Sequence, residues 1–388
     1  MLKIRQNNVL DKYIGAVSVL LLAAGTVFVF SASASVVREI NLAQFYRDVG
    51  LRRLVLFPVA IAVLYLFGRF DYRYLSLQRG WSKSVAVYLL ALSVILLLVV
   101  LLPWLGTEVN SARRWLRMSI AGGDISFQPS ELAKWSLMFF LAAYLARYAD
   151  SLYLYRRRFL PVCLVVGLIA GLIILEDFGT AVFVVLLAFL MLLIGGVRWR
   201  HLLTPLPFAG AAFAAVVISS PSRLNRIQAF LNPQEWSGTT AYQANQSLIA
   251  LGSGGLWGKG LGCGISKYGH LPEDTTDFIF AVIGEELGFV GTAGVILLFV
   301  IFIWLGILTV ARCRDDFGRL LAAAIVMCIG IQAVINIGVV TVMLPTKGIP
   351  LPFVSAGGTS MLLTSAAAGI LMNVARVSCS GGEEGQSP

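Results

Sequence analysis

Charge is scarce in this chain of 388 residues. Only 13% of its residues are charged and 58% are hydrophobic, whereas soluble domains typically carry about 25% charged residues. This excludes a soluble enzyme with one anchor and indicates a polytopic membrane protein. The net charge of +10 would suggest nucleic acid as the partner of a soluble protein. Here loop charges that orient a membrane protein explain much of it, so we expect no nucleic acid.

Cysteine is also scarce. The five cysteines are scattered, with no metal-ligand spacing and no pattern of a disulfide framework. The first residues, MLKIRQNN, lack the pattern of a cleavable signal, so we expect the first apolar run to stay in the protein. No internal repeat is evident, and an inverted-repeat transporter therefore gains no direct support.

Long apolar runs dominate the sequence. Continuous runs of about 20 residues favour membrane-spanning helices over the short alternating strands of a barrel. We therefore predict an all-α polytopic membrane protein with about ten transmembrane helices and large extracytoplasmic loops. The eighth run exceeds one span and is expected to tilt or to extend beyond the bilayer. The predicted spans are 13–32, 54–70, 84–102, 131–147, 159–175, 178–197, 202–220, 277–311, 318–341 and 359–376.

Basic residues in the short loops predict the orientation. They favour a topology with both termini in the cytoplasm, although basic residues in long outer loops weaken the bias. We predict one membrane domain, 1–377, followed by a disordered cytoplasmic tail, 378–388, rich in Gly, Ser and Glu.

Three polar connections fall on the predicted outer side, at about 104–130, 221–276 and 342–358. Their clustering predicts a site that opens to the outside or to the outer leaflet. The second connection contains LGSGGLWGKGLGCG (251–264), which lacks the pattern of a nucleotide-binding loop. Two interpretations are equally favoured: a tightly turning re-entrant segment, or a backbone surface that a lipid headgroup approaches closely.

A carboxylate stands where the second connection gives way to the eighth run. Asp277 follows Thr275 and Thr276 and precedes the apolar FIFAVI. It is either an acid near a helix N-terminus or a functional group at a membrane boundary, where carboxylates are costly. Both roles can coexist, because capping would hold a general base rigidly. Glu285 and Glu286 lie two turns deeper, and at least one is expected to find a donor in the bundle interior.

Candidate cations lie in the first and third connections. Arg113 and Arg114 are adjacent, so they cannot both face the same way on a regular element. Glu131 and Lys134 lie on one face of the fourth span at i and i+3. They form a neutralising ion pair, or else Lys134 and the arginines bind an anionic group from the outer leaflet. Lys347, held among prolines, is either a solvated surface cation or an anion ligand.

Six motifs of this chain form one recognisable set: ARRW (112–115), FQPSELAK (127–134), DFGTA (177–181), YQANQSLIALGSGG (242–255), KYGHLPEDTTDFIFAVIGEELG (267–288) and LPTKGIPLPFVSAGGTS (344–360). Together these motifs resemble the SEDS family of membrane glycosyltransferases, the FtsW/RodA proteins of bacterial division and elongation. The matches run in family order across most of the chain, and the ten spans agree with the family's topology. The segment 344–348 is more similar to the division branch, FtsW.

Three positions depart from the family pattern. Thr275 stands where relatives usually have His, Ala356 where they have Tyr, and Glu176 where they often have Pro. Thr275 lies close to Asp277, so the first departure puts in doubt any accessory role for the histidine that relatives have there. Asp177, beside Glu176, is expected to cap the sixth span rather than to act in catalysis.

The resemblance implies polymerisation of lipid II, an undecaprenyl-diphosphate disaccharide-peptide, on the outer face of the bacterial cytoplasmic membrane, at the division septum. A departing diphosphate needs cations, and an acceptor hydroxyl needs a carboxylate to take its proton. The resemblance assigns the base role to Asp277. The implied substrate-binding residues are Arg113, Arg114, Lys134, Lys347, Glu131 and Gln128.

The resemblance also implies partners and leaves alternatives open. We expect a class B penicillin-binding protein (a transpeptidase) and other divisome membrane proteins as partners. No metal-ligand cluster is evident, while help from a divalent cation (Mg²⁺ or Mn²⁺) stays open. The alternative functions are an elongation-type polymerase like RodA, a lipid II flippase, or a non-catalytic divisome scaffold.

Overall fold

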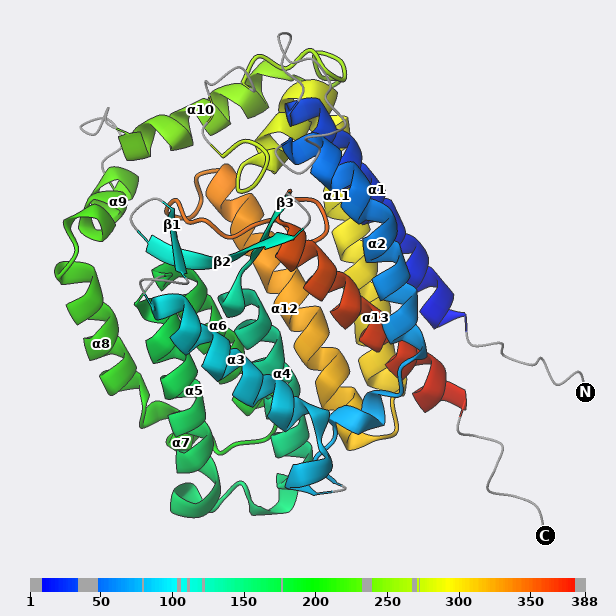
Figure 1. Ribbon diagram of the computed structural model, residues 1–388, viewed down its shortest axis with the longest axis vertical. Helices are drawn as coiled ribbons and strands as arrows, with labels where there is room; N and C mark the ends of the chain where they lie inside the picture. The colour runs from blue at the N-terminus through cyan, green and yellow to red at the C-terminus, as the bar shows by residue number, and fades with distance from the viewer. Residues whose placement is uncertain are drawn as a thin grey trace, which may run out of the picture.

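Helices form a bundle in which α1 begins and α13 ends at the same end (Figure 1). The computed structural model describes residues 9–33, 48–78, 80–102, 106–109, 112–120, 123–175, 177–231, 239–266, 271 and 273–380. The departure at Glu176 lies outside these residues.

Each predicted span coincides with a helix of this bundle. Seven helices of the described part of the chain are long and apolar enough to cross a membrane, and α3 and α6 are shorter apolar helices. The all-α polytopic class is therefore confirmed. The helices are α1 (Leu10–Ser33), α2 (Val49–Arg69), α3 (Val85–Leu101), α4 (Pro129–Arg147), α5 (Leu160–Ile174), α6 (Phe178–Ile194), α7 (Trp199–Leu203), α8 (Leu206–Ile218), α11 (Ile279–Arg312), α12 (Asp316–Val340) and α13 (Gly358–Ser380).

The buried centre of the bundle is built by α4 and α12. Almost every side chain of α4 between Pro129 and Leu145 is buried, and α12 is buried along most of its length. These two helices are in contact with each other. Charged and amide side chains on them are therefore shielded from lipid and must find partners within the protein.

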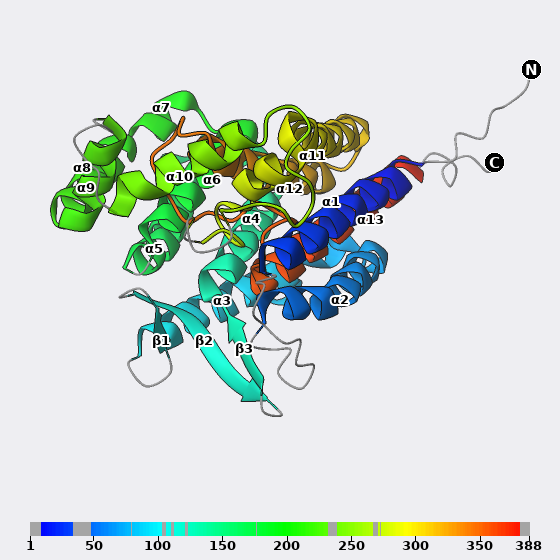
Figure 2. The ribbon, with the colours of Figure 1, turned by 90° about the horizontal axis from the view of Figure 1, so that it is seen from above.

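The first connection contains a small sheet that the sequence analysis missed. Strands β1 (Gly106–Val109), β2 (Ala112–Ile120) and β3 (Gly123–Phe127) pair antiparallel in the order β1-β2-β3. The sheet lies beside α3 and α4, and β2 contacts both helices (Figure 2). It adds a rigid wall at one end of an otherwise helical protein.

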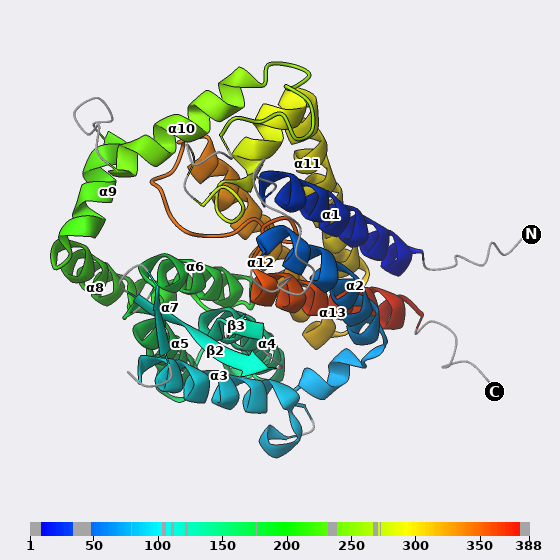
Figure 3. The same cartoon turned by 45° about the horizontal axis from the view of Figure 1, so that its top comes forward.

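The second connection is largely helical rather than irregular. Helices α9 (Pro221–Leu231) and α10 (Thr239–Ser253) run across the end of the bundle from α8 towards α11 (Figures 1 and 3). The segment between α12 and α13, drawn in orange, reaches towards α9 and returns to the bundle (Figure 3). The three connections therefore gather at one end, as predicted.

A break in α11 explains the excess length of the eighth run. Gly288 has φ 65° and ψ −159° inside the helix. The backbone groups freed by the break bond to the glycine-rich loop, where N–H groups of residues 259 and 260 donate to carbonyls 285 and 286 at 3.0 and 2.9 Å. A Cβ on Gly258, whose φ is 78°, would lie 2.1 Å from the Glu286 carbonyl oxygen. The tight turns of this loop thus serve packing against α11.

Both acids near this break are satisfied in the interior. The Lys259 amine lies 2.7 Å from Glu285, and the Ser31 hydroxyl donates to Glu286 at 2.8 Å. The expectation that at least one would find a donor is confirmed.

At the C-terminal end of the chain, α13 continues to Ser380, so the first residues of the predicted tail are helical. Residues 381–388 lie outside the described residues.

Candidate active site

A polar cavity of about 780 Å³ lies at the end of the bundle where the three connections meet. Four carboxylates and three cations line it, together with amide and hydroxyl side chains. The lining residues are Arg114, Trp115, Gln128, Glu131, Asp177, Thr180, Arg226, Gln243, Glu273, Thr276, Asp277, Phe278, Thr346, Lys347, Gly348, Pro350, Gly357 and Ser360. The cavity thus joins parts of the chain that are far apart in sequence.

Asp277 lies just before α11 and faces this cavity. The helix begins at Ile279, its N-cap residue is Phe278, and no side-chain hydrogen bond caps it. The carboxylate therefore does not occupy the cap position that the sequence suggested as one of its roles. A Cβ on Gly348 would lie 2.9 Å from Oδ2 of Asp277, so the neighbouring segment approaches the carboxylate as closely as a glycine allows.

The surroundings of Asp277 hold its proton more tightly than water would. Burial, followed by the negative charges of Glu273 and Asp177, raises the pKa of Asp277 from 3.8 to about 7. The positive charges of Arg114 and Arg226 oppose this shift. A carboxyl group of this kind exchanges its proton near neutral pH, which suits a general base.

Two amide side chains of α12 tie Asp277 to the segment that precedes α13. Asn336 donates through Nδ2 to the carbonyl oxygens of Asp277 and Ile349, both at 2.8 Å. One turn earlier, Gln332 donates through Nε2 to the carbonyl oxygen of Pro350 at 2.8 Å. Both amides are at most 2% exposed. Because these donors sit on one rigid helix, the two cavity walls keep a fixed spacing.

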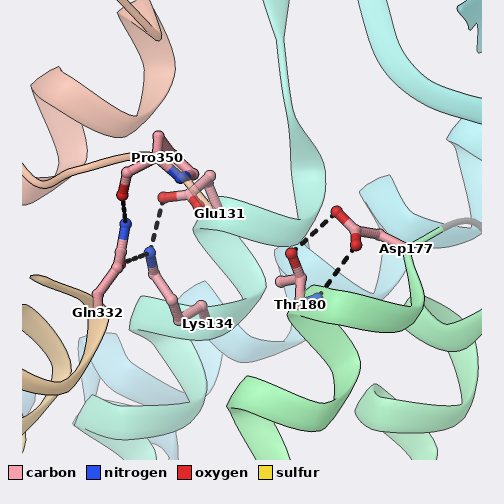
Figure 4. Close-up of polar contacts among 6 residues, drawn as sticks. All are labelled: Glu131, Lys134, Asp177, Thr180, Gln332 and Pro350. Carbon is pink, nitrogen blue, oxygen red and sulfur yellow. Dashed lines mark hydrogen bonds and ion pairs between the residues drawn. The ribbon is translucent and has the colours of Figure 1, made fainter. Parts of the chain in front are cut away.

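Lys134 lies behind the cavity wall rather than on it. Its amine, 1% exposed, donates to Glu131 at 2.8 Å and to Gln332 at 2.9 Å (Figure 4). Glu131 lines the cavity, and Lys134 is not among the lining residues. Of the two sequence interpretations, this geometry corresponds to the ion pair, and the lysine supports Glu131 and Gln332 from beneath.

Asp177 caps α6 and also lines the cavity. Its carboxylate accepts from the Thr180 N–H at 3.1 Å and from the Thr180 hydroxyl at 2.9 Å (Figure 4). The predicted capping is confirmed, but the position on the cavity wall was missed.

Burial lowers the pKa of Lys347, and the charge of Asp177 opposes that change. The Lys347 amine lies 5.5 Å from the centre of the Phe178 ring.

The two adjacent arginines are placed differently. Arg114 lines the cavity and Arg113 is not among the lining residues. Arg114 lies at an irregularity of the β1–β2 pairing, where Arg113 pairs with Glu108 and Trp115 pairs with Thr107. Gln128, at the start of α4, lines the cavity as well.

Besides Asp177, the sequence analysis missed three charged or amide residues of the lining. Arg226 comes from α9, Gln243 from α10, and Glu273 from the segment before Asp277. Gln243 lies within the motif YQANQSLIALGSGG, which offered a signal. Arg226 offered none, because only the path of α9 across the bundle end brings it to the cavity.

Two departures from the family pattern contact each other. The Ala356 N–H donates to the Thr275 carbonyl oxygen at 3.0 Å. Ala356 is 3% exposed, so a larger side chain there would require its neighbours to move. The small residues at both positions therefore belong to one local packing arrangement beside Asp277.

Comparisons with known proteins agree on one family. A family model described as "Cell cycle protein", that of FtsW, RodA and SpoVE, matches residues 12–379. The chain is 36% identical over 372 residues to stage V sporulation protein E of Bacillus subtilis, covering 95% of this chain and 97% of that protein. It is 38% identical over 360 residues to the probable peptidoglycan glycosyltransferase FtsW of Trichlorobacter lovleyi, covering 92% and 90%.

Two solved structures are similar over most of the chain. One is described as "Structural coordination of polymerization and crosslinking by a peptidoglycan synthase complex", with a TM-score of 0.71, 25% identity and coverage of 94% of this chain and 97% of that chain. The other is the rod shape determining protein RodA of Thermus thermophilus, with a TM-score of 0.61, 27% identity and coverage of 97% and 98%.

Replacing Asn336 by leucine should destabilise the protein. The change leaves the carbonyl groups of Asp277 and Ile349 buried without their donor, which costs about 2–4 kcal/mol in the free energy of unfolding. Denaturant unfolding in detergent micelles measures this. The matched control is Thr364→Val, because the buried Thr364 hydroxyl has no hydrogen-bond partner among the described residues. Equal losses in both variants would contradict the role of Asn336.

Proposed function

This chain belongs to the FtsW/RodA/SpoVE family, and we propose that it polymerises lipid II into glycan strands with Asp277 as the general base. The relatives named probable peptidoglycan glycosyltransferase FtsW match it over most of both chains. The protein is accordingly a peptidoglycan glycosyltransferase embedded in the membrane. The lipid-linked substrate, the catalytic role of Asp277 and the division role are the finer parts of our proposal.

The observation that carries the proposal is a carboxylate with a pKa of about 7 in the same cavity as three cations. The acceptor hydroxyl oxygen attacks the anomeric carbon of the donor sugar. The bond from that carbon to the diphosphate oxygen breaks, the diphosphate leaves with the electron pair, and Asp277 takes the hydroxyl proton. A direct displacement of this kind inverts the anomeric centre.

The cations stabilise the leaving group. We propose that Arg114, Arg226 and Lys347 contact the diphosphate, because charge develops on its oxygens as it departs. Arginine suits two-point contact with phosphate oxygens and lysine acts as a point charge. Gln128 and Glu131 are proposed to contact the sugar. Lys134, predicted as a ligand, is proposed instead to position Glu131.

Help from a divalent cation (Mg²⁺ or Mn²⁺) stays a prediction. The described residues contain no group of three or more His, Cys, Asp or Glu that could hold a metal ion. A chelator added to the polymerisation assay measures any dependence on Mg²⁺ or Mn²⁺.

We propose a class B penicillin-binding protein as the partner, at the septum and with both termini of this chain in the cytoplasm. The similarity to a chain of a complex that coordinates polymerization and crosslinking supports a partner of that kind. The flippase alternative requires charges along a path across the bilayer, whereas the cavity cations gather at one end of the bundle. The scaffold alternative requires no function for the cavity carboxylate.

Asp277→Asn should abolish glycan polymerisation by purified protein supplied with labelled lipid II and its transpeptidase partner. Losing the base lowers the rate by about 100- to 10,000-fold.

The rate of the native protein should rise with pH through about 7, because only the deprotonated Asp277 accepts a proton. Glu273→Gln should move this midpoint to lower pH, since the charge of Glu273 raises the pKa of Asp277.

The matched control is Asp274→Asn. Burial raises the pKa of Asp274 to about 6, yet Asp274 is not among the residues lining the cavity. This variant should polymerise at close to the native rate. Native-like activity of Asp277→Asn would refute the base role and leave the scaffold alternative standing.

Gly348→Ala should impair catalysis by displacing the Asp277 carboxylate. The added methyl group would lie 2.9 Å from Oδ2 of Asp277, and a misplacement of about 1 Å can cost about 100-fold in rate. Gly167→Ala is the control, because Gly167 of α5 does not line the cavity and no atom lies within 4 Å of its added Cβ. Polymerisation rates compared at equal amounts of folded protein measure the effect. Similar rates for both variants would argue against close packing on the carboxylate.

The division role predicts a specific depletion phenotype. Cells depleted of this protein should continue to elongate without completing septa, and a fluorescent fusion should collect at the division site. Microscopy after depletion checks both. Rounded cells that still divide would support the elongation alternative instead.

A further inference from the structure

We propose that Arg53 of α2 is a positioning residue for Asp277 that acts through the buried turn before α13. This inference rests on the proposed function of Asp277. Arg53 is 1% exposed within a candidate membrane span. A charged side chain in such a place is costly, and it is retained where it serves a function.

The guanidinium of Arg53 bonds to the backbone of this turn. Nη1 donates to the Ser355 carbonyl oxygen at 2.8 Å, and Nη2 donates to the Phe353 carbonyl oxygen. Its Nε has no hydrogen-bond partner among the described residues. The printed contacts of Arg53 thus concentrate on two carbonyl groups that lie two residues apart.

The turn depends on these donors. Phe353, Val354 and Ser355 are all at most 4% exposed. Phe353 has φ 62°, a conformation that non-glycine residues seldom adopt. Carbonyl groups turned out of a helix and buried in an apolar bundle need donors, because no water reaches them. Arg53 supplies donors to two of them.

Helix α1 closes the other side of the turn. A Cβ on Gly25 would lie 2.5 Å from the Val354 Cα and 2.8 Å from Nη2 of Arg53. The turn is therefore held between α1 and α2 with no spare room, and Arg53 fixes it from the α2 side.

Hydrogen bonds connect this turn to the segment that carries Asp277. The Ser355 hydroxyl donates to the Thr276 carbonyl oxygen at 2.5 Å and accepts from the Leu351 N–H at 2.7 Å. The Ala356 N–H donates to the Thr275 carbonyl oxygen at 3.0 Å. Since Ser355 bonds to Arg53 through its carbonyl and to Thr276 through its hydroxyl, a displacement of the turn displaces the residues directly before Asp277.

An arginine fits this role better than a lysine does. The planar guanidinium offers separate donors at fixed spacing to the two carbonyl groups, whereas an ammonium group offers one nitrogen on a flexible stem. Arg53→Lys keeps the charge and should restore part of the positioning. Arg53→Met keeps an unbranched apolar side chain and removes every donor.

The test compares Arg53→Met, Arg53→Lys and the control Arg52→Met in the full-length protein with its partner. Arg52 is the adjacent cation on α2, and its side chain takes no part in the hydrogen bonds of this turn among the described residues. We expect Arg53→Met to lower kcat by about tenfold or more while KM changes less than about threefold, since the lining residues remain. Arg53→Lys should fall between, and Arg52→Met should match the native protein.

Hydrogen–deuterium exchange supplies a readout other than activity. In Arg53→Met, amide exchange should increase in peptides covering 351–356 and 275–277 and stay unchanged in α5 and α6. A native kcat in Arg53→Met would overturn the inference. So would a loss of activity that only follows the amount of folded protein while exchange at 275–277 is unchanged.

If Asp277→Asn proves active, the proposed function fails while the exchange data still test Arg53. If Asp277→Asn is inactive and Arg53→Met is native-like, only this inference fails.

Discussion

The hydrogen bonds of Asn336 hold the rest of the site together. One buried amide bonds to the carbonyl oxygens of Asp277 and Ile349 and so joins two segments that are 72 positions apart in the sequence numbering. Gln332, one turn away, extends the same tie to Pro350 and, through Lys134, to Glu131 on α4. The central helices α4 and α12 thereby set the distance between a carboxylate and the segment that carries Lys347.

The apolar surroundings explain why this arrangement needs so many buried polar groups. Backbone that leaves a helix at membrane depth requires donors and acceptors from within the protein. The glycine-rich loop supplies them at the break in α11, and Arg53 supplies them at the turn before α13. The irregular backbone at these two places is thus held by hydrogen bonds within the protein. The Asp277 carboxylate therefore stays in a fixed position and still faces the cavity.

Much of the fold could be predicted from the sequence, because span length and apolar composition directly determine membrane helices. The apolar helices were predicted in this way, and the gathering of the connections at one end followed from the predicted topology. The sheet was missed because its residues lie in a polar stretch without a clear alternating pattern. The break in α11 appeared only as excess length, since Gly288 is one glycine among many.

The site was predicted in outline and changed in its details. Asp277, Lys347, Gln128, Glu131 and Arg114 all reach the cavity, whereas Lys134 lies behind it. The sequence alone could not show whether Lys134 binds substrate or supports its neighbours, because its role depends on a hydrogen bond to Gln332 of a distant helix. Arg226 was missed for the same reason, as its place depends on how α9 crosses the bundle.

The central claim is that one cavity holds the leaving diphosphate among cations while Asp277 faces the acceptor hydroxyl. A structure of the protein with a bound lipid-linked disaccharide diphosphate tests it most directly. The account predicts the diphosphate beside Arg114 and Lys347, and the acceptor hydroxyl within about 3 Å of the Asp277 carboxylate. A diphosphate bound elsewhere on the protein, or an acceptor hydroxyl out of reach of Asp277, would contradict it.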